Sequence, residues 1–248
     1  MGRAAAVLGR RRAHALAVLL AALVAYGAGA GVLPNSSEAW DVAFFAILLV
    51  PATLAVVWLV LPAARARGLV LVGLALVVVS ALLHVAGFDA LFNVTKLLAL
   101  AALGFAFLIV FEPPLGLLVL IPAIVPWVDA YSVWRGPTNV VVNEHPGLFD
   151  RIAVAFREPG TETAARLGPP DVLFFALFLA AAQQFRLRTG WTFLSMVACL
   201  GLTLVFAAAF DISGLPALPA VSLGFLVPNA DLLWRRWREW RVSEARAG

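Results

Sequence analysis

Long apolar segments, separated by short polar or Gly/Pro-containing breaks, dominate the chain. The hydrocarbon core of a bilayer requires about 20 apolar residues per helix, because every backbone polar group in lipid must be paired within the helix. Eight segments approach that length, and they cover residues 14–32, 42–61, 68–86, 90–111, 115–134, 172–185, 191–210 and 215–234. The pattern predicts an all-α, polytopic transmembrane helical bundle of about eight spans.

The sixth apolar segment is the shortest, since its apolar run begins only after Asp171. Irregular backbone is not tolerated against lipid. This helix therefore either begins before Asp171 or has part of its length in a cavity lined by protein. The longest polar stretch, about residues 135–170, connects it to the fifth segment.

Composition supports a chain embedded in a lipid bilayer. Of the 248 residues, 63% are hydrophobic and only 13% are charged, and the mean hydropathy of +0.97 is far from that of soluble domains. The net charge of +4 does not indicate a nucleic-acid partner, because the basic residues lie beside apolar segments. Cys199 is the only cysteine. We therefore expect no internal disulfide, no metal site and no cofactor.

Arginine residues orient the predicted spans. They precede the first segment and follow the second, sixth and eighth: Arg3, Arg10, Arg11, Arg12, Arg65, Arg67, Arg186, Arg188, Arg235, Arg236, Arg238, Arg241 and Arg246. An even number of spans places all of them on one side, which the positive-inside rule makes cytoplasmic. We expect an integral protein of the plasma (inner) membrane with both termini in the cytoplasm. The N-terminal segment also resembles a signal peptide, and its removal would leave seven spans in the same orientation.

Ionisable side chains within apolar segments are costly to insert, so each one marks a candidate functional site. Asp211 and Asp231 lie at segment ends and are explained as caps, and Lys96 is close enough to a segment end to extend toward the membrane surface. Asp129 lies inside the outer boundary of the fifth segment. Asp171 follows two prolines, and a helix cap by itself explains a carboxylate there.

Asp129 and Asp171 gain significance as a pair. The fifth segment runs outward and the sixth runs inward, so both carboxyl groups are predicted to lie near the outer side of the bilayer. Two carboxyl groups close together in a low-dielectric site cannot both ionise cheaply, and they share one proton. One carboxylate can then activate water while the other, protonated, polarises a peptide carbonyl, as in aspartic proteases.

Three stretches resemble the GxGD intramembrane aspartyl proteases, the family of presenilin and signal peptide peptidase. The helix with the family's first catalytic aspartate is similar to WVDAYSVWR in this chain. The LGxGD element and the helix after it are similar to ARLGPPDVLFFALFLA, and the segment with the PAL motif is similar to LPALPAVSLGF. The resemblance covers about residues 115–234 and implies a presenilin-like fold with Asp129 and Asp171 as catalytic residues. It implies a substrate-binding wall of Gly168, Pro170, Pro216, Ala217 and Leu218.

The sequence departs from the family pattern at two points. Pro170 replaces the second glycine of the GxGD element, so a residue that permits positive φ gives way to one that fixes φ and has no N–H donor. The aspartates also fall on the fifth and sixth predicted spans, whereas family members usually carry them on the sixth and seventh of nine helices. The first departure bears on activity and on how substrate docks beside Asp171.

Together these features predict an intramembrane aspartic endopeptidase that hydrolyses transmembrane segments or signal-peptide remnants. Residues 1–112 would hold four N-terminal spans, and residues 113–248 would form the catalytic half with the two Asp-bearing spans and the PAL-bearing C-terminal span. The expected partners are transmembrane peptide or protein substrates and the lipid bilayer. Short β-prone runs after Arg135 predict either a hairpin that adds a strand to unwound substrate or an ordinary surface loop.

Two other functions remain open from the sequence. One is a catalytically silent presenilin-like protein that binds membrane segments without cutting them, for which the main argument is Pro170. The other is a small ion- or proton-coupled transporter in which Asp129, Asp171 and Lys96 form a path through the membrane.

Overall fold

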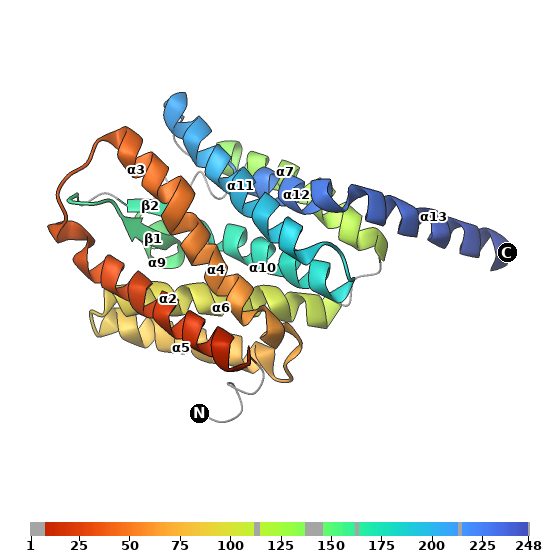
Figure 1. Cartoon of the computed structure of the whole chain (residues 1–248), viewed down its shortest axis with the longest axis horizontal. Helices are drawn as coiled ribbons and strands as arrows, with labels where there is room; N and C mark the ends of the chain where they lie inside the picture. The colour runs from red at the N-terminus through yellow and green to blue at the C-terminus, as the bar shows by residue number, and fades with distance from the viewer. Residues whose placement is uncertain (1–7, 112–114, 137–145, 162–163, 213–214, 248) are drawn as a thin grey trace.

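The computed structural model describes residues 8–111, 115–136, 146–161, 164–212 and 215–247. Helices pack into a bundle, and a small two-stranded sheet lies at one end of it (Figure 1). The helices are α2 (Arg10–Gly29), α3 (Glu38–Phe44), α4 (Val50–Val60), α5 (Leu69–Val85), α6 (Asp89–Phe111), α7 (Leu115–Arg135), α9 (Pro146–Ile152), α10 (Pro169–Gln184), α11 (Thr189–Ala209), α12 (Leu218–Leu226) and α13 (Ala230–Ala247). The strands are β1 (Val154–Arg157) and β2 (Ala164–Leu167).

All eight predicted segments are largely helical, which agrees with the expected all-α bundle, but their lengths differ from the prediction. Within the described residues, five helices are long and apolar enough to cross a bilayer: Arg10–Val32, Glu38–Arg65, Asp89–Ile109, Gly116–Arg135 and Thr189–Ala209. α5 is apolar but shorter. By length and composition, the described part of the chain therefore has five helices that could span a bilayer, and the predicted number of about eight is not confirmed.

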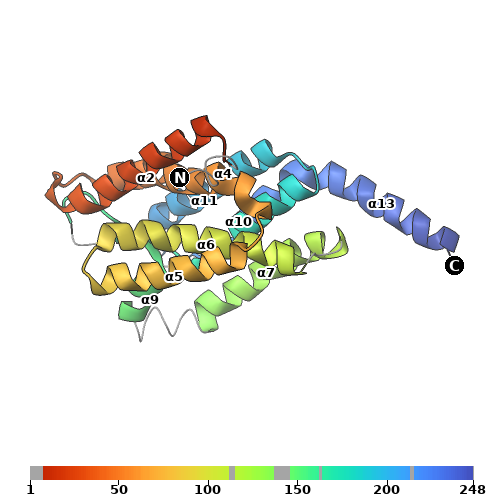
Figure 2. The same ribbon diagram turned by 90° about the horizontal axis from the view of Figure 1, so that it is seen from below.

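Prolines explain why the last predicted segment is shorter than expected. It is divided into α12, a 3-10 turn at Val227–Asn229 and α13, with Pro219 and Pro228 in the first turns of α12 and of the 3-10 element. Proline lacks the N–H that a continuous helix requires. α13 extends away from the bundle in both views (Figures 1 and 2).

α10 is the core helix of the bundle. It packs against α6, α11 and α12, and its buried residues are Val172, Phe175, Ala176, Leu177, Phe178, Leu179, Ala180, Ala181 and Ala182. α10 begins two residues before Asp171, as one of the two sequence-based alternatives predicted. Gly104 of α6 permits the close approach, because a Cβ atom there would lie 2.5 Å from the carbonyl oxygen of Leu173. Small residues at such contacts are typical of membrane helices.

α7 lies at the periphery of the bundle and packs mainly against α12. Its outward face is apolar, and Ile124, Trp127 and Val128 are exposed on it. Pro122 and Pro126 lie inside the helix, where each removes one backbone hydrogen bond. α7 is therefore the less firmly packed of the two helices that carry the paired aspartates.

The two strands form an antiparallel hairpin between α9 and α10, pairing Val154 with Leu167 and Arg157 with Ala164. Of the two β-prone runs after Arg135, LFDRIAVAFREPG contains β1, whereas NVVV lies outside the described residues. A hairpin is therefore present, but its second strand, β2, lies in AARL, outside both predicted runs. Asn93 of α6 binds the outer edge of β1, because its amide donates to the Ala155 carbonyl at 2.6 Å and accepts from the Ala155 N–H at 2.9 Å.

A polar cluster fixes the opposite end of the bundle, where α10 connects to α11. Arg188 donates two hydrogen bonds to Asp231, both 2.8 Å long, and one of 2.7 Å to the Pro228 carbonyl. Asn229 is fully buried, and its amide donates to Thr192 Oγ1 and accepts from the Arg188 N–H. These bonds join the α10–α11 connection to the start of α13.

Candidate functional site

Asp129 connects α7 to the beginning of α12. Its carboxylate Oδ2 accepts a hydrogen bond of 3.0 Å from the backbone N–H of Leu218, the first residue of α12. The first N–H groups of a helix have no partner within the helix, and a negative charge is favoured beside them. Asp129 thus caps a helix other than its own, and the capped residue belongs to the PAL motif.

Asp171 lies in the first turn of α10. Its Oδ2 accepts a hydrogen bond of 2.9 Å from the N–H of Gly168, the N-cap residue of the same helix. The interpretation of Asp171 as a helix cap is therefore confirmed. In addition to capping α10, Asp171 lines a cavity of about 210 Å³.

Asp129 and Asp171 both lie beside the start of α12. Asp129 bonds to the Leu218 N–H there. Asp171 shares its cavity with Ala217, which is the N-cap residue of α12. Residues far apart in sequence are therefore brought together: Asp129 on α7, Asp171 on α10 and the PAL motif before α12.

The residues around Asp171 show how the LGPPD sequence fits the structure. Gly168 has a φ of −61°, so it does not need the left-handed region, but a Cβ atom there would lie 3.0 Å from Asp171 Oδ2. Pro170 is helical, in the first turn of α10, where the missing N–H has little cost. Position 170 is helical, so its backbone does not use the positive φ that a glycine would permit.

The three PAL residues lie directly before and at the start of α12. Leu218 is buried and donates to Asp129. Ala217 lines the Asp171 cavity, and Pro216 immediately precedes it. The predicted wall residues therefore all lie in the first turns of α10 and α12 or directly before them: Gly168, Pro170, Pro216, Ala217 and Leu218.

Strand β2 and helix α11 complete the cavity, and sequence reasoning did not identify them. The strand contributes Ala165, Arg166 and Leu167, and Phe156 of β1 and Thr203 of α11 also line the space. Ala165 and Arg166 directly precede LGPPD and Leu167 begins it, so their position in sequence could have indicated them. Thr203 carried no such signal, because an isolated threonine in an apolar helix is common.

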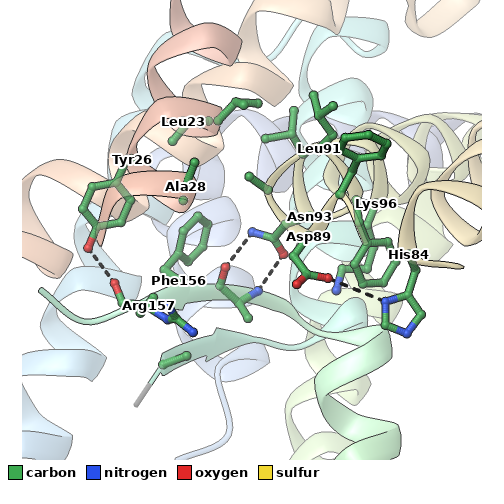
Figure 3. A pocket seen from close by; sticks show the side chains of 18 of the residues that line it. Leu23, Tyr26, Ala28, His84, Asp89, Leu91, Asn93, Lys96, Phe156 and Arg157 are labelled. Carbon is green, nitrogen blue, oxygen red and sulfur yellow. Dashed lines mark hydrogen bonds and ion pairs between the residues drawn. The ribbon is translucent and has the colours of Figure 1, made fainter. Parts of the chain in front are cut away.

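Lys96 does not line the cavity beside the aspartates. It lines a second cavity of about 860 Å³ at the end of α6 (Figure 3). Lys96 is 8% exposed, and its amine donates a hydrogen bond of 3.2 Å to the Arg151 carbonyl. The structure therefore separates Lys96 from the two carboxyl groups that the transporter hypothesis would join to it.

The Asp171 cavity is small for a binding site. Its 210 Å³ lies below the range of about 300–1,000 Å³ that is typical of small-molecule pockets. An α-helix with side chains is about 10–12 Å wide, so a helical segment cannot enter. The space suits water molecules or a few residues of extended chain.

Comparison with known proteins does not assign this site. No protein-family model matches the chain, and no curated protein matches its sequence significantly. The case for a function rests on the geometry of Asp129, Asp171 and the residues around them.

Proposed function

We propose that this protein is an intramembrane aspartic endopeptidase with a presenilin-like fold, in which Asp129 and Asp171 form the catalytic dyad. One observation carries the proposal: Asp129 bonds to Leu218 of the PAL motif, and Asp171 shares a cavity with Ala217 of the same motif. Three separate elements that the resemblance joins in one active site thus meet at one place. A simple helix cap explains each aspartate alone but gives no reason for their proximity.

The chemistry requires one proton shared by the two carboxyl groups. The ionised carboxylate takes a proton from water as the water oxygen bonds to the peptide carbon, and the protonated carboxyl gives its proton to the carbonyl oxygen. The resulting diol collapses as the C–N bond breaks, and the leaving nitrogen takes up a proton. Backbone N–H groups of Leu218 and Gly168 hold the two carboxyl groups in orientation, which is the positioning that such a step needs.

Substrate would bind as an extended segment beside β2. Asn93 occupies the outer edge of β1, so an added strand would pair with β2, which borders the Asp171 cavity. Adding a strand to a sheet edge is a common mode of peptide recognition. Because a helix does not fit the cavity, a transmembrane substrate or signal-peptide remnant would have to unwind before cleavage.

The arginine pattern supports a finer proposal for location. With both termini in the cytoplasm of a cell bounded by the plasma (inner) membrane, the dyad and the hairpin would lie toward the outer leaflet. The two competing functions have less support. Pro170 fits a helical first turn, which weakens the argument for a silent relative, and Lys96 lines a different cavity, which weakens that for an ion path.

The proposal is tested with the purified full-length protein in liposomes and a model transmembrane peptide, with fragments detected by mass spectrometry. Asp129→Asn and Asp171→Asn are each expected to reduce cleavage by about 10²–10⁴-fold, since each removes one of the proton-transferring groups. Asp211→Asn is the matched control, because Asp211 is exposed and has a φ of +49°, which asparagine also accepts.

Unchanged cleavage in either dyad variant would contradict the proposal. Binding of the peptide without cleavage by the wild-type protein would instead identify a silent relative. The thermal stability of each variant, measured in the same liposomes, distinguishes loss of chemistry from loss of fold.

A further inference from the structure

A large cavity lies away from the aspartates, at the end of two long apolar helices. It has a volume of about 860 Å³ and is bounded by α2, α6, α9 and the hairpin. Figure 3 shows Leu23 and Ala28 of α2 and Leu91 of α6 on one side, and Arg157 of β1 on another. The space is large enough for a drug-sized ligand.

Positive charge is concentrated on the polar side of this cavity. Four basic side chains line it: Lys96, Arg151, Arg157 and Arg166. Among the described lining residues, Asp89 is the sole acid, and it lies 3.8 Å from His84. A cleft lined mainly by one sign of charge, with low-dielectric walls, attracts ions of the opposite sign.

The apolar side of the cavity belongs to membrane helices. Leu23 and Val24 lie on α2, within the span Arg10–Val32, and Val94 lies on α6, within the span Asp89–Ile109. α2 reaches its end at Gly29 and α6 begins at Asp89, so the cavity lies where two spans meet the membrane surface. It therefore combines an apolar wall at membrane depth with basic groups at the height of lipid headgroups.

We propose that this cavity binds an anionic phospholipid, with the phosphate at the arginine side chains and the acyl chains along α2 and α6. The guanidinium group suits this ligand, because its planar fork of donors matches the oxygens of a phosphate bidentately. A soluble phosphate would use the same basic groups but would leave the apolar wall of α2 without a partner. The combination of both walls favours the lipid as the source of the anion.

Lipid binding at this cavity would also affect the position of the hairpin beside Asp171. Phe156 and Arg166 line both the 860 Å³ cavity and the Asp171 cavity, so the hairpin is a shared wall. A lipid on one side would hold β1 and β2 in place against the other. This coupling rests on the proposed peptidase function, whereas lipid binding itself does not.

The test uses the full-length protein, purified in detergent and titrated with phosphatidylglycerol while its thermal unfolding is followed. The informative variant combines Arg151→Gln and Arg157→Gln. The backbone carbonyls of these residues accept bonds from Lys96 and Tyr26, and side-chain replacement leaves those bonds available. The matched control combines Arg236→Gln and Arg238→Gln, which removes the same charge from α13.

Phosphatidylglycerol is expected to raise the unfolding temperature of the wild-type protein, because a ligand that binds only the folded state stabilises it. The cavity variant should require about tenfold more lipid for the same shift, and the α13 control should respond like the wild type. Phosphatidylcholine and inorganic phosphate should each give a much smaller shift. If the cavity variant proves unstable without lipid, each single substitution is titrated instead and should lose part of the response.

The proposal would be overturned by an equal shift with phosphatidylcholine, by an equal shift with inorganic phosphate, or by an unchanged response in the cavity variant. Loss of the response in the α13 control would also contradict it, because the lipid would then act at α13. The same titration on Asp129→Asn should match the wild type. The test of lipid binding is therefore independent of the test of peptide cleavage.

Discussion

The two helices that carry the paired aspartates differ in how the protein holds them. α10 is packed by α6, α11 and α12, and Phe178 on it is only 2% exposed. α7 packs mainly on α12, and Trp127 on it is 78% exposed. One half of the proposed dyad is therefore fixed by the core, and the other half is positioned by a peripheral helix.

This difference shows where the geometry of the site can change. Asp171 moves only if the core moves, because its helix is enclosed by protein. Asp129 depends on a helix with two internal prolines and on its bond to Leu218. We therefore expect changes in α10 to alter the stability of the protein, and changes in α7 to alter cleavage with little effect on stability.

The largest expected effect contrasts one aromatic residue on each helix. Phe178 stacks on Phe225 with ring centroids 5.0 Å apart, so Phe178→Ala should lower the free energy of unfolding by about 3–5 kcal/mol. Trp127→Ala, on the lipid-facing side of α7, should change it by less than about 1 kcal/mol, because surface substitutions usually have small effects. Denaturant titration in detergent measures both values, and equal losses would refute the contrast.

A smaller effect is expected from straightening α7. Pro126→Ala supplies an N–H that can bond to the carbonyl of residue 122, four positions earlier, and so relieves the interruption of the helix. Asp129 lies less than one turn beyond this point, and a shift of about 1 Å in a catalytic group can cost about 10²-fold in rate. Cleavage should fall about 10–100-fold with no decrease in unfolding temperature, because alanine adds a hydrogen bond to the helix. Trp127→Ala, which leaves the helix backbone unaltered, is the comparison, and undiminished cleavage in Pro126→Ala would show that α7 does not set the geometry.

The smallest effect concerns the polar cluster at the opposite end of the bundle, outside the five spans. Hydrogen bonds from Arg188 lower the pKa of Asp231 below its ordinary value of 3.8. A lowered pKa in the folded state stabilises the protein above 3.8, and this contribution is lost as the pH falls through the lowered pKa. Asp231→Asn should therefore flatten the acid side of the stability–pH curve slightly, since both partners are partly exposed and solvent screens the pair. Thermal unfolding between pH 3 and pH 7 measures this, and an identical acid slope in both proteins would exclude the contribution.

Sequence predicted much of the local structure correctly. The apolar segments gave the helices, and Pro-Pro-Asp gave the start of α10 with Asp171 as its cap. The β-prone run LFDRIAVAFREPG gave β1. Each of these features depends on residues that are close together in the chain. These local signals are prolines, a capping carboxylate and apolar runs of sufficient length.

Other features were decided only by tertiary structure. The sequence did not reveal that α10 is enclosed while α7 is peripheral, because residues that face lipid and residues that face protein are equally apolar in a membrane bundle. Nor did it show the bond between Asp129 and Leu218, the strand β2 beside Asp171, or Lys96 in a separate cavity. These contacts join positions distant in sequence, and no local pattern encodes which helix ends meet. The sequence thus determined by itself that Asp129 and Asp171 belong to apolar helices, and the packing of α7, α10 and α12 decided that both lie beside the start of α12.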